Sequence, residues 1–329
     1  MKLAINGFGR IGRSVLKIAL KEGLDVEAIN DLHGAEDASY LLKYDSIYGR
    51  YKGKVEVDNG DLIVNGKRIR MFKETNPAKL PWKKLGIDVV VESTGVFRDR
   101  EGASLHLKAG AKRVVITSPA KGQDVTIAPG VNQKKLNAKH KIISVASCTT
   151  NCLAPVMKIL NDNFVVKEAI MNTVHAYTSS QNLLDGSNKR LRRGRAADLN
   201  IVPSSTGASE AVGEVIPELK GKITGMSLRV PVACGSILDV VVRLKKDFNV
   251  KKINETFKKA SLNEMKGIVE YTEDEIVSSD VIGNSSSAVI DGLSTQVSGE
   301  LLRVVAWYDN EYGYSNRVVD VIKILKRLS

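Results

Sequence analysis

Two side chains in this sequence have the type and setting needed for covalent chemistry on a carbonyl carbon, and Cys148 is the first. It follows the apolar stretch Ile142–Val145, and the residues after it have helical spacing, so the thiol is predicted at a strand-to-helix turn. A helix N-terminus favours thiolate through its dipole and free N–H groups, so we expect a lowered pKa for Cys148. Thiolate is the form that attacks a carbonyl carbon, which indicates Cys148 as a nucleophile.

The second is His175, one of four histidines. Any one histidine is more often structural than catalytic, but His175 ends the strand-like stretch Glu168–His175 and opens a loop rich in hydroxyls and amides. A neutral imidazole beside the thiol could take a proton from the reacting carbon's hydroxyl as hydride leaves. The other cysteines, Cys152 and Cys234, are interpreted as small buried residues. No His and Cys cluster completes a ligand set, and three cysteines do not suit a disulfide framework, so we expect no metal and no disulfide.

A glycine pattern near the N-terminus predicts a dinucleotide site. Gly7, Gly9 and Gly12 fit G-x-G-x-x-G between the apolar stretch Lys2–Asn6 and a helical pattern. The first glycine allows a tight turn, the second lets backbone approach the pyrophosphate, and the third lets helix and strand touch. The helix N-terminus offers free N–H groups to the phosphates. Asp31 follows the next strand, where a carboxylate would bind the ribose hydroxyls and repel a 2′-phosphate, which favours NAD over NADP.

Three further segments suit an anionic ligand. Lys189–Arg195 is a dense basic run, and Ser204–Gly207 is a hydroxyl-rich and glycine-containing turn that opens a helix. Arg229 lies among apolar strand residues, where an unpaired cation would be costly. The alternatives for the basic run are a solvated surface or a nucleic-acid patch.

The secondary-structure elements predicted to position these residues follow different patterns before and after Cys148. Before it, strand-like and helical patterns alternate, which predicts an α/β fold with a doubly wound parallel sheet of Rossmann type. The predicted strands are Lys2–Asn6, Asp25–Asn30, Val55–Val57, Leu62–Val64, Arg68–Phe72, Asp88–Glu92, Val114–Thr117 and Ile142–Val145. The predicted helices are Ile11–Lys21, Ala35–Leu42 and Arg100–Ala109, with turns at Asn59-Gly60 and Asn65-Gly66.

After Cys148, one helix to about Phe164 precedes long alternating strands, as in an antiparallel sheet with one covered face. These strands are Glu168–His175, Thr224–Val230, Ile237–Leu244 and Leu301–Tyr308, followed by a helix over Tyr314–Leu328. We therefore expect a Rossmann domain over residues 1–147 and an α+β catalytic domain with a mainly antiparallel sheet over 148–311. The C-terminal helix, 312–329, is expected to pack back on the first domain.

Length and composition suit two packed domains of a soluble protein. The chain has 329 residues, of which 43% are hydrophobic and 26% charged, and this excludes a largely disordered chain. No apolar run approaches the roughly 18 residues needed to span a bilayer, and no signal peptide is evident, so we expect a cytoplasmic protein without a membrane partner. The net charge of +12 suits either a solvated surface or anionic partners.

Taken together, these motifs closely resemble the phosphorylating glyceraldehyde-3-phosphate dehydrogenase family. The matching segments, in family order and over essentially the whole chain, are Asn6–Arg13, Leu41–Ser46, Ser147–Asn151, His175–Thr178, Ser205–Ala208 and Trp307–Ser315. The resemblance implies oxidation of glyceraldehyde 3-phosphate to 1,3-bisphosphoglycerate with NAD, through a thioester and inorganic phosphate. It also implies a homotetramer, in which the loop around Gly186–Arg195 reaches a neighbouring subunit's cofactor site.

The resemblance also implies a role for each matching residue. Cys148 would be the nucleophile and His175 the base. Thr178 and Arg229 would hold the substrate phosphate, and Asn310 would orient the nicotinamide carboxamide. The attacking phosphate would be held by Ser147, Thr206, Gly207 and Arg193, and Thr149 belongs to the same phosphate-binding set. The cofactor set is Gly7, Gly9, Arg10, Ile11, Gly12, Asp31 and Thr117, with Asn310.

The chain departs from the family pattern in places that bear on cofactor and substrate. Pro231–Ser236 reads Pro-Val-Ala-Cys-Gly-Ser where Pro-Thr-Pro-Asn-Val-Ser is common, so this loop is expected to have a different shape. Ser187 resembles NADP-using relatives, whereas Asp31 and Leu32 favour NAD, so NAD is preferred and NADP stays possible. Two alternatives remain: an erythrose-4-phosphate dehydrogenase, and a basic nucleic-acid-binding protein on a retained scaffold. Beside enzyme activity, nucleic acid is expected only as a weak side-activity.

Overall fold

The computed structural model describes residues 1–328 and divides into two compact units. The first comprises Met1–Ile127, Gln133–Ala146 and the chain from Ser315 onward. The second comprises Ala128–Asn132 and Ser147–Tyr314. The main part of the second unit begins at Ser147, so the predicted nucleophile Cys148 is its second residue.

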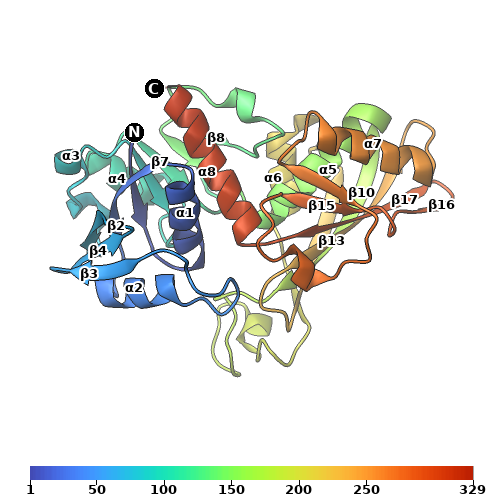
Figure 1. Cartoon of the computed structure of the whole chain (residues 1–329). Helices are drawn as coiled ribbons and strands as arrows, with labels where there is room; N and C mark the ends of the chain where they lie inside the picture. The colour runs from blue at the N-terminus through green and yellow to red at the C-terminus, as the bar shows by residue number, and fades with distance from the viewer. Residues whose placement is uncertain (329) are drawn as a thin grey trace. The chain divides into compact units, whose positions relative to one another are not determined.

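A nine-stranded sheet forms the centre of the first unit (Figure 1), in the order β3-β4-β5-β2-β1-β6-β7-β9-β8. From β5 to β8 all neighbouring strands are parallel, and β3, β4 and β5 form an antiparallel meander at the other edge. The strands are β1 (Lys2–Asn6), β2 (Asp25–Asn30), β3 (Val55–Asp58), β4 (Asp61–Val64), β5 (Lys67–Phe72), β6 (Val89–Glu92), β7 (Arg113–Ile116), β8 (Val125–Thr126) and β9 (Ile142–Ser144). This arrangement confirms the predicted parallel sheet of Rossmann type.

Helices connect several of these strands, and the apolar faces of the helices pack on the sheet. The helices are α1 (Arg10–Lys21), α2 (Ala35–Lys43), α3 (Trp82–Leu85) and α4 (Arg100–Lys108). In α1 the apolar residues Val15, Leu16, Ile18 and Ala19 are all buried, as the helical spacing predicts. The C-terminal helix α8 (Tyr312–Arg327) belongs to this unit from Ser315 onward, and its Lys323 Nζ donates to Glu22 Oε2, just past the end of α1, at 2.6 Å.

The meander is closed by the two predicted turns. Asn59 and Gly60 have φ of 50° and 78°, and Asn65 and Gly66 have φ of 51° and 81°. Two consecutive positive φ values are what a two-residue hairpin of the right twist requires, and Asn-Gly supplies them at the lowest steric cost. The sequence prediction of both turns is confirmed.

An eight-stranded sheet forms the second unit, in the order β11-β12-β10-β13-β17-β15-β14 with β16 paired to β17 (Figure 1). The strands are β10 (Val166–Ala176), β11 (Val202–Ser204), β12 (Ile223–Val230), β13 (Ser236–Leu244), β14 (Val269–Thr272), β15 (Ala288–Asp291), β16 (Gln296–Ser298) and β17 (Leu301–Tyr308). The sheet is mostly antiparallel, as expected, but two pairs are parallel, β10 with β12 and β14 with β15. A parallel pair needs a long crossover connection, and the segment from 177 to 222, which contains β11 and α6 (Ala208–Val215), provides one.

Helices cover one face of this sheet. The helix α5 (Cys148–Phe164) contacts β10, β13 and β15, and α7 (Val250–Leu262) contacts α5 and β14. Side chains along β13 alternate between the core and the opposite face, and Leu238, Val240 and Val242 are fully buried. The prediction of one covered face is therefore confirmed.

Along the described part of the chain, 1–328, no helix combines the length and apolar character needed to cross a membrane.

Candidate functional site

The two residues predicted to do chemistry lie in contact in the second unit. Cys148 is the first residue of α5, and Ser147 is its N-cap, with Oγ accepting from the backbone N–H of Thr150 at 3.1 Å. His175 is near the end of β10, and its Nε2 lies 3.4 Å from Cys148 Sγ. Cys148 and His175 are 27 residues apart in the sequence, and they meet because α5 packs on β10. This is hydrogen-bond range for sulfur and nitrogen, so a proton can pass between them.

The surroundings of His175 favour one tautomer. Nδ1 lies 2.7 Å from the carbonyl oxygen of Ala176, which can only accept, so this short contact places the proton on Nδ1. Arg229 Nη1 also lies 3.0 Å from Nδ1 and, as an obligate donor, would favour the opposite tautomer. The Ala176 contact is the shorter of the two, and Arg229 has this same oxygen as its acceptor at 3.0 Å, so we assign the proton to Nδ1. The lone pair of the ring is then on Nε2 and faces the sulfur of Cys148. The imidazole is oriented as a base.

Burial and charge keep this imidazole neutral. Burial is the largest cause that lowers the pKa of His175, to about 3, and the positive charge of Arg229 acts in the same direction. The hydrogen bond to Ala176 opposes them. The imidazole next to the thiol is therefore neutral near pH 7.

The predicted lowering of the Cys148 pKa is wrong. Burial raises the pKa of this thiol, although the charge of Arg229 and hydrogen bonds at the start of α5, chiefly from Thr149, act to lower it. The helix N-terminus is present as expected, but desolvation of the thiolate outweighs it. In this state of the protein the sulfur therefore carries its proton, and His175 Nε2 is the acceptor facing it.

Two arginines place uncompensated positive charge beside this pair. Burial lowers the pKa of Arg229, and burial followed by repulsion from Arg229 lowers the pKa of Arg193 to about 10. The Nε atoms of both are buried without a hydrogen-bond partner, and within residues 1–328 neither guanidinium has a carboxylate at ion-pair distance. Partly buried cations without counter-ions create a strong local preference for an anion.

Hydroxyl groups line the same region. Arg193 Nη1 donates to Ser180 Oγ at 3.0 Å, and Ser180 Oγ lies 2.9 Å from Thr178 Oγ1. The structure thus brings together the predicted phosphate residues Thr178 and Arg193 through Ser180, to which the sequence analysis gave no role. Ser180 lies in the hydroxyl-rich loop after His175, and that composition was the available signal.

The turn before α6 follows a strand that pairs beside Arg229. Strand β11 pairs with β12 so that Val202 is opposite Arg229, and the chain then runs to Thr206 and Gly207. Thr206 Oγ1 accepts from the N–H of Ala208 at 3.2 Å, and Gly207, the N-cap of α6, is exposed. The free N–H groups of this helix start are available to an anion.

Thr149 differs from the other predicted phosphate residues. It is 5% exposed, and its hydroxyl lies 3.0 Å from the hydroxyl of Tyr308. Tyr308 also bonds Thr173 Oγ1 at 2.8 Å and packs edge-on against His175, with ring centroids 5.9 Å apart. Thr149 is therefore held within the core, where it supports His175 through Tyr308. No sequence pattern indicated a role for Tyr308.

The amide of Asn310 has a fixed orientation. Its Oδ1 accepts from the N–H of Gly235 at 3.2 Å and from Ser236 Oγ at 2.9 Å, which leaves Nδ2 as the donor to present to a ligand. Gly235 belongs to the loop that departs from the family pattern. It has φ of +87°, and a Cβ there would lie 2.1 Å from the carbonyl oxygen of Ser278. Glycine is required at this position, which accounts for that part of the departure.

The first unit contains the glycine turn in the predicted setting, between β1 and α1. Gly7 has φ of +90°, and a Cβ on Gly12 would lie 2.1 Å from the carbonyl oxygen of Gly7, so neither position admits a side chain. At Gly9, by contrast, a Cβ would meet nothing within 4 Å. That open position at the start of α1 is where a pyrophosphate could approach the backbone. Ile11, the second residue of α1, is half-buried.

Asp31 stabilises this turn from the end of β2. Its Oδ2 accepts from the N–H of Phe8 at 2.7 Å, and Oδ1 accepts from the N–H of His33 at 3.1 Å. A pocket of about 410 Å³ adjoins it. The pocket is lined by Phe8, Gly9, Arg13, Asp31, His33, Asp37, Ala38 and Leu41.

Two other residues of the predicted cofactor set have partners within the protein. The guanidinium of Arg10 forms an ion pair with Asp45 at 3.0 Å, so its charge is compensated. Thr117 Oγ1 donates to the carbonyl oxygen of Glu92 at 3.1 Å, between β6 and β7. These contacts secure the loops at the carboxyl ends of the strands.

Known proteins similar to this chain match it over almost its full length. Residues 1–100 match the family model described as glyceraldehyde 3-phosphate dehydrogenase, NAD binding domain, and residues 147–310 match the C-terminal domain of the same family. The chain is 54% identical over 333 residues to glyceraldehyde-3-phosphate dehydrogenase of Borreliella burgdorferi, covering 99% of each chain. It is 52% identical to glyceraldehyde-3-phosphate dehydrogenase 1 of Kluyveromyces lactis, covering 98% of this chain and 99% of the relative. It is 51% identical to the Geobacillus stearothermophilus enzyme, covering 98% and 97%.

Proposed function

This chain belongs to the glyceraldehyde-3-phosphate dehydrogenase family and oxidises glyceraldehyde 3-phosphate with NAD, and we propose that Cys148 and His175 carry out this oxidation through a thioester. The observation that carries the proposal is the 3.4 Å contact between Cys148 Sγ and His175 Nε2, beside two arginines without counter-ions. A nucleophile, a base and an anion site are the parts that oxidation and phosphorylation of an aldehyde phosphate need.

The first step joins the Cys148 sulfur to the aldehyde carbon. The thiol proton leaves through His175 Nε2 and is returned to the aldehyde oxygen, which gives a neutral hemithioacetal. His175 then takes the proton of this hydroxyl while the C–H bond breaks. The bound cofactor supplies the acceptor for the hydride. The products at this stage are a thioester on Cys148 and a protonated His175.

The second step transfers the acyl group to inorganic phosphate. A phosphate oxygen attacks the thioester carbon, the carbon–sulfur bond breaks, and the sulfur of Cys148 leaves with the electron pair and regains its proton from His175. Arg193, with the hydroxyls of Thr178 and Ser147 and the turn at Thr206 and Gly207, is proposed to bind the two phosphate groups, together with Arg229. Positioning of both anions by fixed donors lowers the barrier without further rearrangement.

The first unit is proposed to bind NAD. The open approach at Gly9 and the start of α1 fit the pyrophosphate, and Asp31 fits the ribose hydroxyls. Both oxygens of Asp31 already accept backbone N–H groups, so its charge is held in place where a 2′-phosphate would have to bind. This favours NAD, and use of NADP through the exposed Ser187 is a weaker secondary activity.

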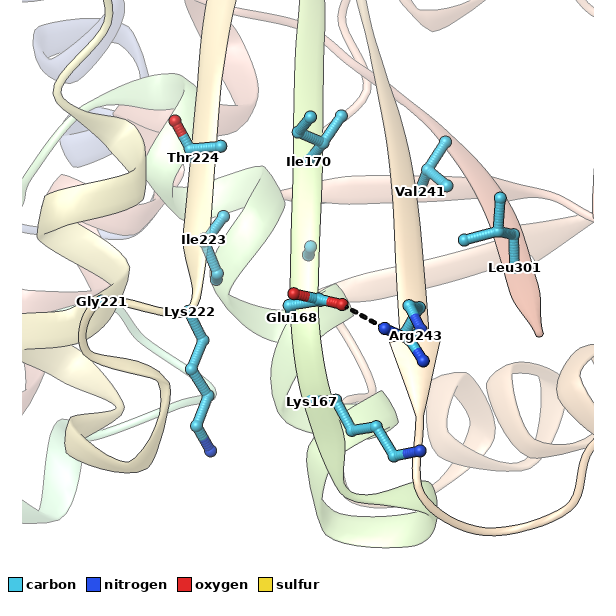
Figure 2. Close-up of a pocket in the computed structure, with 11 residues that line it drawn as sticks. Lys167, Glu168, Ile170, Gly221, Lys222, Ile223, Thr224, Val241, Arg243 and Leu301 are labelled. Atoms are coloured by element: carbon cyan, nitrogen blue, oxygen red, sulfur yellow. Dashed lines mark hydrogen bonds and ion pairs between the residues drawn. The ribbon is translucent and has the colours of Figure 1, made fainter.

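A homotetramer is the proposed assembly. Apolar side chains stay exposed near the loop Gly186–Arg195, among them Leu184 at 73% and Leu191 at 86%. Figure 2 shows a second exposed surface, where Ile170 at 61% lies on the uncovered face of β10 near the ion pair of Glu168 with Arg243 at 2.7 Å. Exposed apolar surface of this extent suits contact with further copies of the chain. Light scattering should give a mass four times that of one chain, and a monomer would contradict the proposal.

The experiment that tests the thioester assignment follows acyl transfer directly. Glyceraldehyde 3-phosphate and NAD are mixed with enzyme in the absence of inorganic phosphate, and we expect one equivalent of NADH per site, followed by turnover when phosphate is added. Erythrose 4-phosphate serves as the comparison aldehyde. Equal turnover with and without phosphate would rule out the proposed acyl acceptor.

The proposed location of the enzyme is the cytoplasm.

A further inference from the structure

A buried carboxylate lies at the end of β6, next to the glycine turn. Glu92 is 2% exposed, and donors reach both of its oxygens. Oε2 accepts from Asn6 Nδ2 at 2.6 Å and lies 3.0 Å from His106 Nε2. Oε1 accepts from the N–H of Thr94 at 2.8 Å and from its hydroxyl. Cys148 belongs to the other unit, so the proposed chemistry leaves this group without a role.

Trp82 determines which nitrogen of His106 carries the proton. The indole N–H can only donate, and it lies 3.0 Å from His106 Nδ1, so Nδ1 accepts and the hydrogen of the neutral ring is on Nε2. That N–H then donates to Glu92. Both side chains are almost completely buried, at 0% and 1% exposure. Four donor groups therefore face the two oxygens of Glu92: the side-chain amide of Asn6, the ring N–H of His106, and the N–H and hydroxyl of Thr94.

This network joins the ends of three parallel strands. Asn6 ends β1, Asn30 ends β2 and Glu92 ends β6, and Asn30 Nδ2 donates to Asn6 Oδ1 at 2.7 Å. The loops that leave these ends carry the glycine turn, Asp31 and Thr94. The backbone of the glycine turn packs tightly against Thr94, since a Cβ on Gly7 would lie only 2.7 Å from the backbone nitrogen of Thr94. A shift of Thr94 would therefore displace the turn.

We propose that Glu92 and His106 are positioning residues for NAD. The carboxyl group of Glu92 holds Asn6 and Thr94 in place, and through them the backbone of the glycine turn. A buried polar group is costly when it loses a hydrogen-bond partner, so loss of the His106 donor should loosen the whole group of strand ends. The inference rests on the proposed assignment of the glycine turn to the cofactor.

Two substitutions of similar volume separate this role from packing. His106→Gln keeps an N–H that can reach Glu92, and His106→Leu fills the space without a donor. In the full-length protein, NAD dissociation constants are measured by titration calorimetry, and KM for NAD is measured separately from kcat. We expect NAD to bind about tenfold more weakly to His106→Leu, since one lost hydrogen bond changes an equilibrium constant by up to about that factor. We expect the affinity of His106→Gln to stay within about threefold of that of the unmodified protein. The kcat at saturating NAD should change little.

A matched control disturbs the same core without removing a donor from Glu92. Leu80→Val trims the core cluster that contains Trp82 and leaves Trp82, His106 and Glu92 unchanged, so NAD affinity should be retained. If His106→Leu does not fold, Thr94→Val removes the hydroxyl donor instead and should also weaken NAD binding. Equal dissociation constants for the Gln and Leu variants, or a lowered melting temperature with unchanged NAD affinity, overturn the positioning role. Absence of NAD binding to the unmodified protein would instead overturn the proposed function.

Discussion

Burial and a neighbouring cation keep the His175 ring neutral far below the pH at which an exposed histidine gains its proton. Its pKa in the folded protein is lowered to about 3, against about 6.5 in an unfolded chain. As the pH falls below 6.5 the unfolded state binds a proton that the folded state does not, so this residue lowers the stability of the fold. At pH 5 the loss is about 2 kcal/mol.

His175→Asn should remove this pH dependence. We expect the free energy of unfolding of the variant to fall less between pH 7 and pH 5 than that of the unmodified protein, by about 2 kcal/mol. Urea unfolding at one protein concentration and both pH values gives the comparison. The same variant should slow acylation by ~10²–10⁴-fold, the usual contribution of a positioned base. Identical pH slopes for the two proteins would contradict the neutral, buried state.

Cys148→Ser tests the nucleophile with almost no change of shape. The hydroxyl is a far weaker nucleophile than a thiol, so NADH formation should cease, both in the first turnover and at steady state. NAD binding should be preserved, because the glycine turn and Asp31 are in the other unit. The absorbance of reduced nicotinamide after rapid mixing measures the first property, and calorimetry with NAD measures the second. Full activity of this variant would exclude covalent catalysis.

At this scale the sequence predicted residue types better than their electrostatics. The contact between Cys148 and His175 follows from elements that the sequence located, a strand end and a helix start. The pKa of Cys148 was predicted in the wrong direction because helix position is visible in a sequence and desolvation is not. Tyr308 and Ser180 were missed for a similar reason: the partners of a hydroxyl group are set by tertiary packing.

At the scale of elements, periodicity located the long helices and strands to within about two residues. Both hairpin turns and the parallel sheet followed from local signals. The short strands β8, β11, β14, β15 and β16 were not predicted, because two to four residues carry no resolvable period. The helix α7 was also missed, since only Ile253, Phe257 and Ala260 of its 13 residues are buried. The parallel pairing of β10 with β12 depends on a crossover that no local pattern shows.

Gly235 offers a prediction about the loop between β12 and β13. Gly235→Ala should destabilise the protein by ~1–3 kcal/mol, because the residue has φ of +87° and its Cβ would lie 2.1 Å from Ser278 O. Gly221→Ala is the matched control, with φ of +76° and open space around the added atom. Thermal melting should place Gly235→Ala clearly below Gly221→Ala. Equal melting temperatures of the two variants would show that the loop accommodates the added Cβ next to Ser278 without loss of stability.

The same substitution should affect the cofactor. Gly235 donates its N–H to Asn310 Oδ1, so a shifted loop releases the amide that is proposed to face the nicotinamide. We therefore expect KM for NAD to rise in Gly235→Ala and to stay unchanged in Gly221→Ala. This couples the unusual loop sequence to function through one hydrogen bond.

At the scale of the whole molecule, charge is arranged in a way that suits an anionic substrate. The chain carries 49 basic and 37 acidic residues, for a net charge of +12. Arg229 and Arg193 add uncompensated cations at the proposed site. A net positive charge, together with cations at the site, raises the encounter rate of a negatively charged ligand.

Salt should therefore slow capture of the aldehyde phosphate and leave a neutral aldehyde unaffected. Raising ionic strength from about 0.01 to 0.15 M shortens the screening length from about 30 to 8 Å, and we expect kcat/KM for glyceraldehyde 3-phosphate to fall several-fold. Unphosphorylated glyceraldehyde is the control, since it has no charge to attract and reacts at the same Cys148. Both are measured at fixed NAD and with arsenate or phosphate held constant. An equal fall for the two aldehydes would assign the effect to the protein's own stability or to the cofactor, whereas a fall for the phosphorylated substrate alone shows that the basic surface serves its capture.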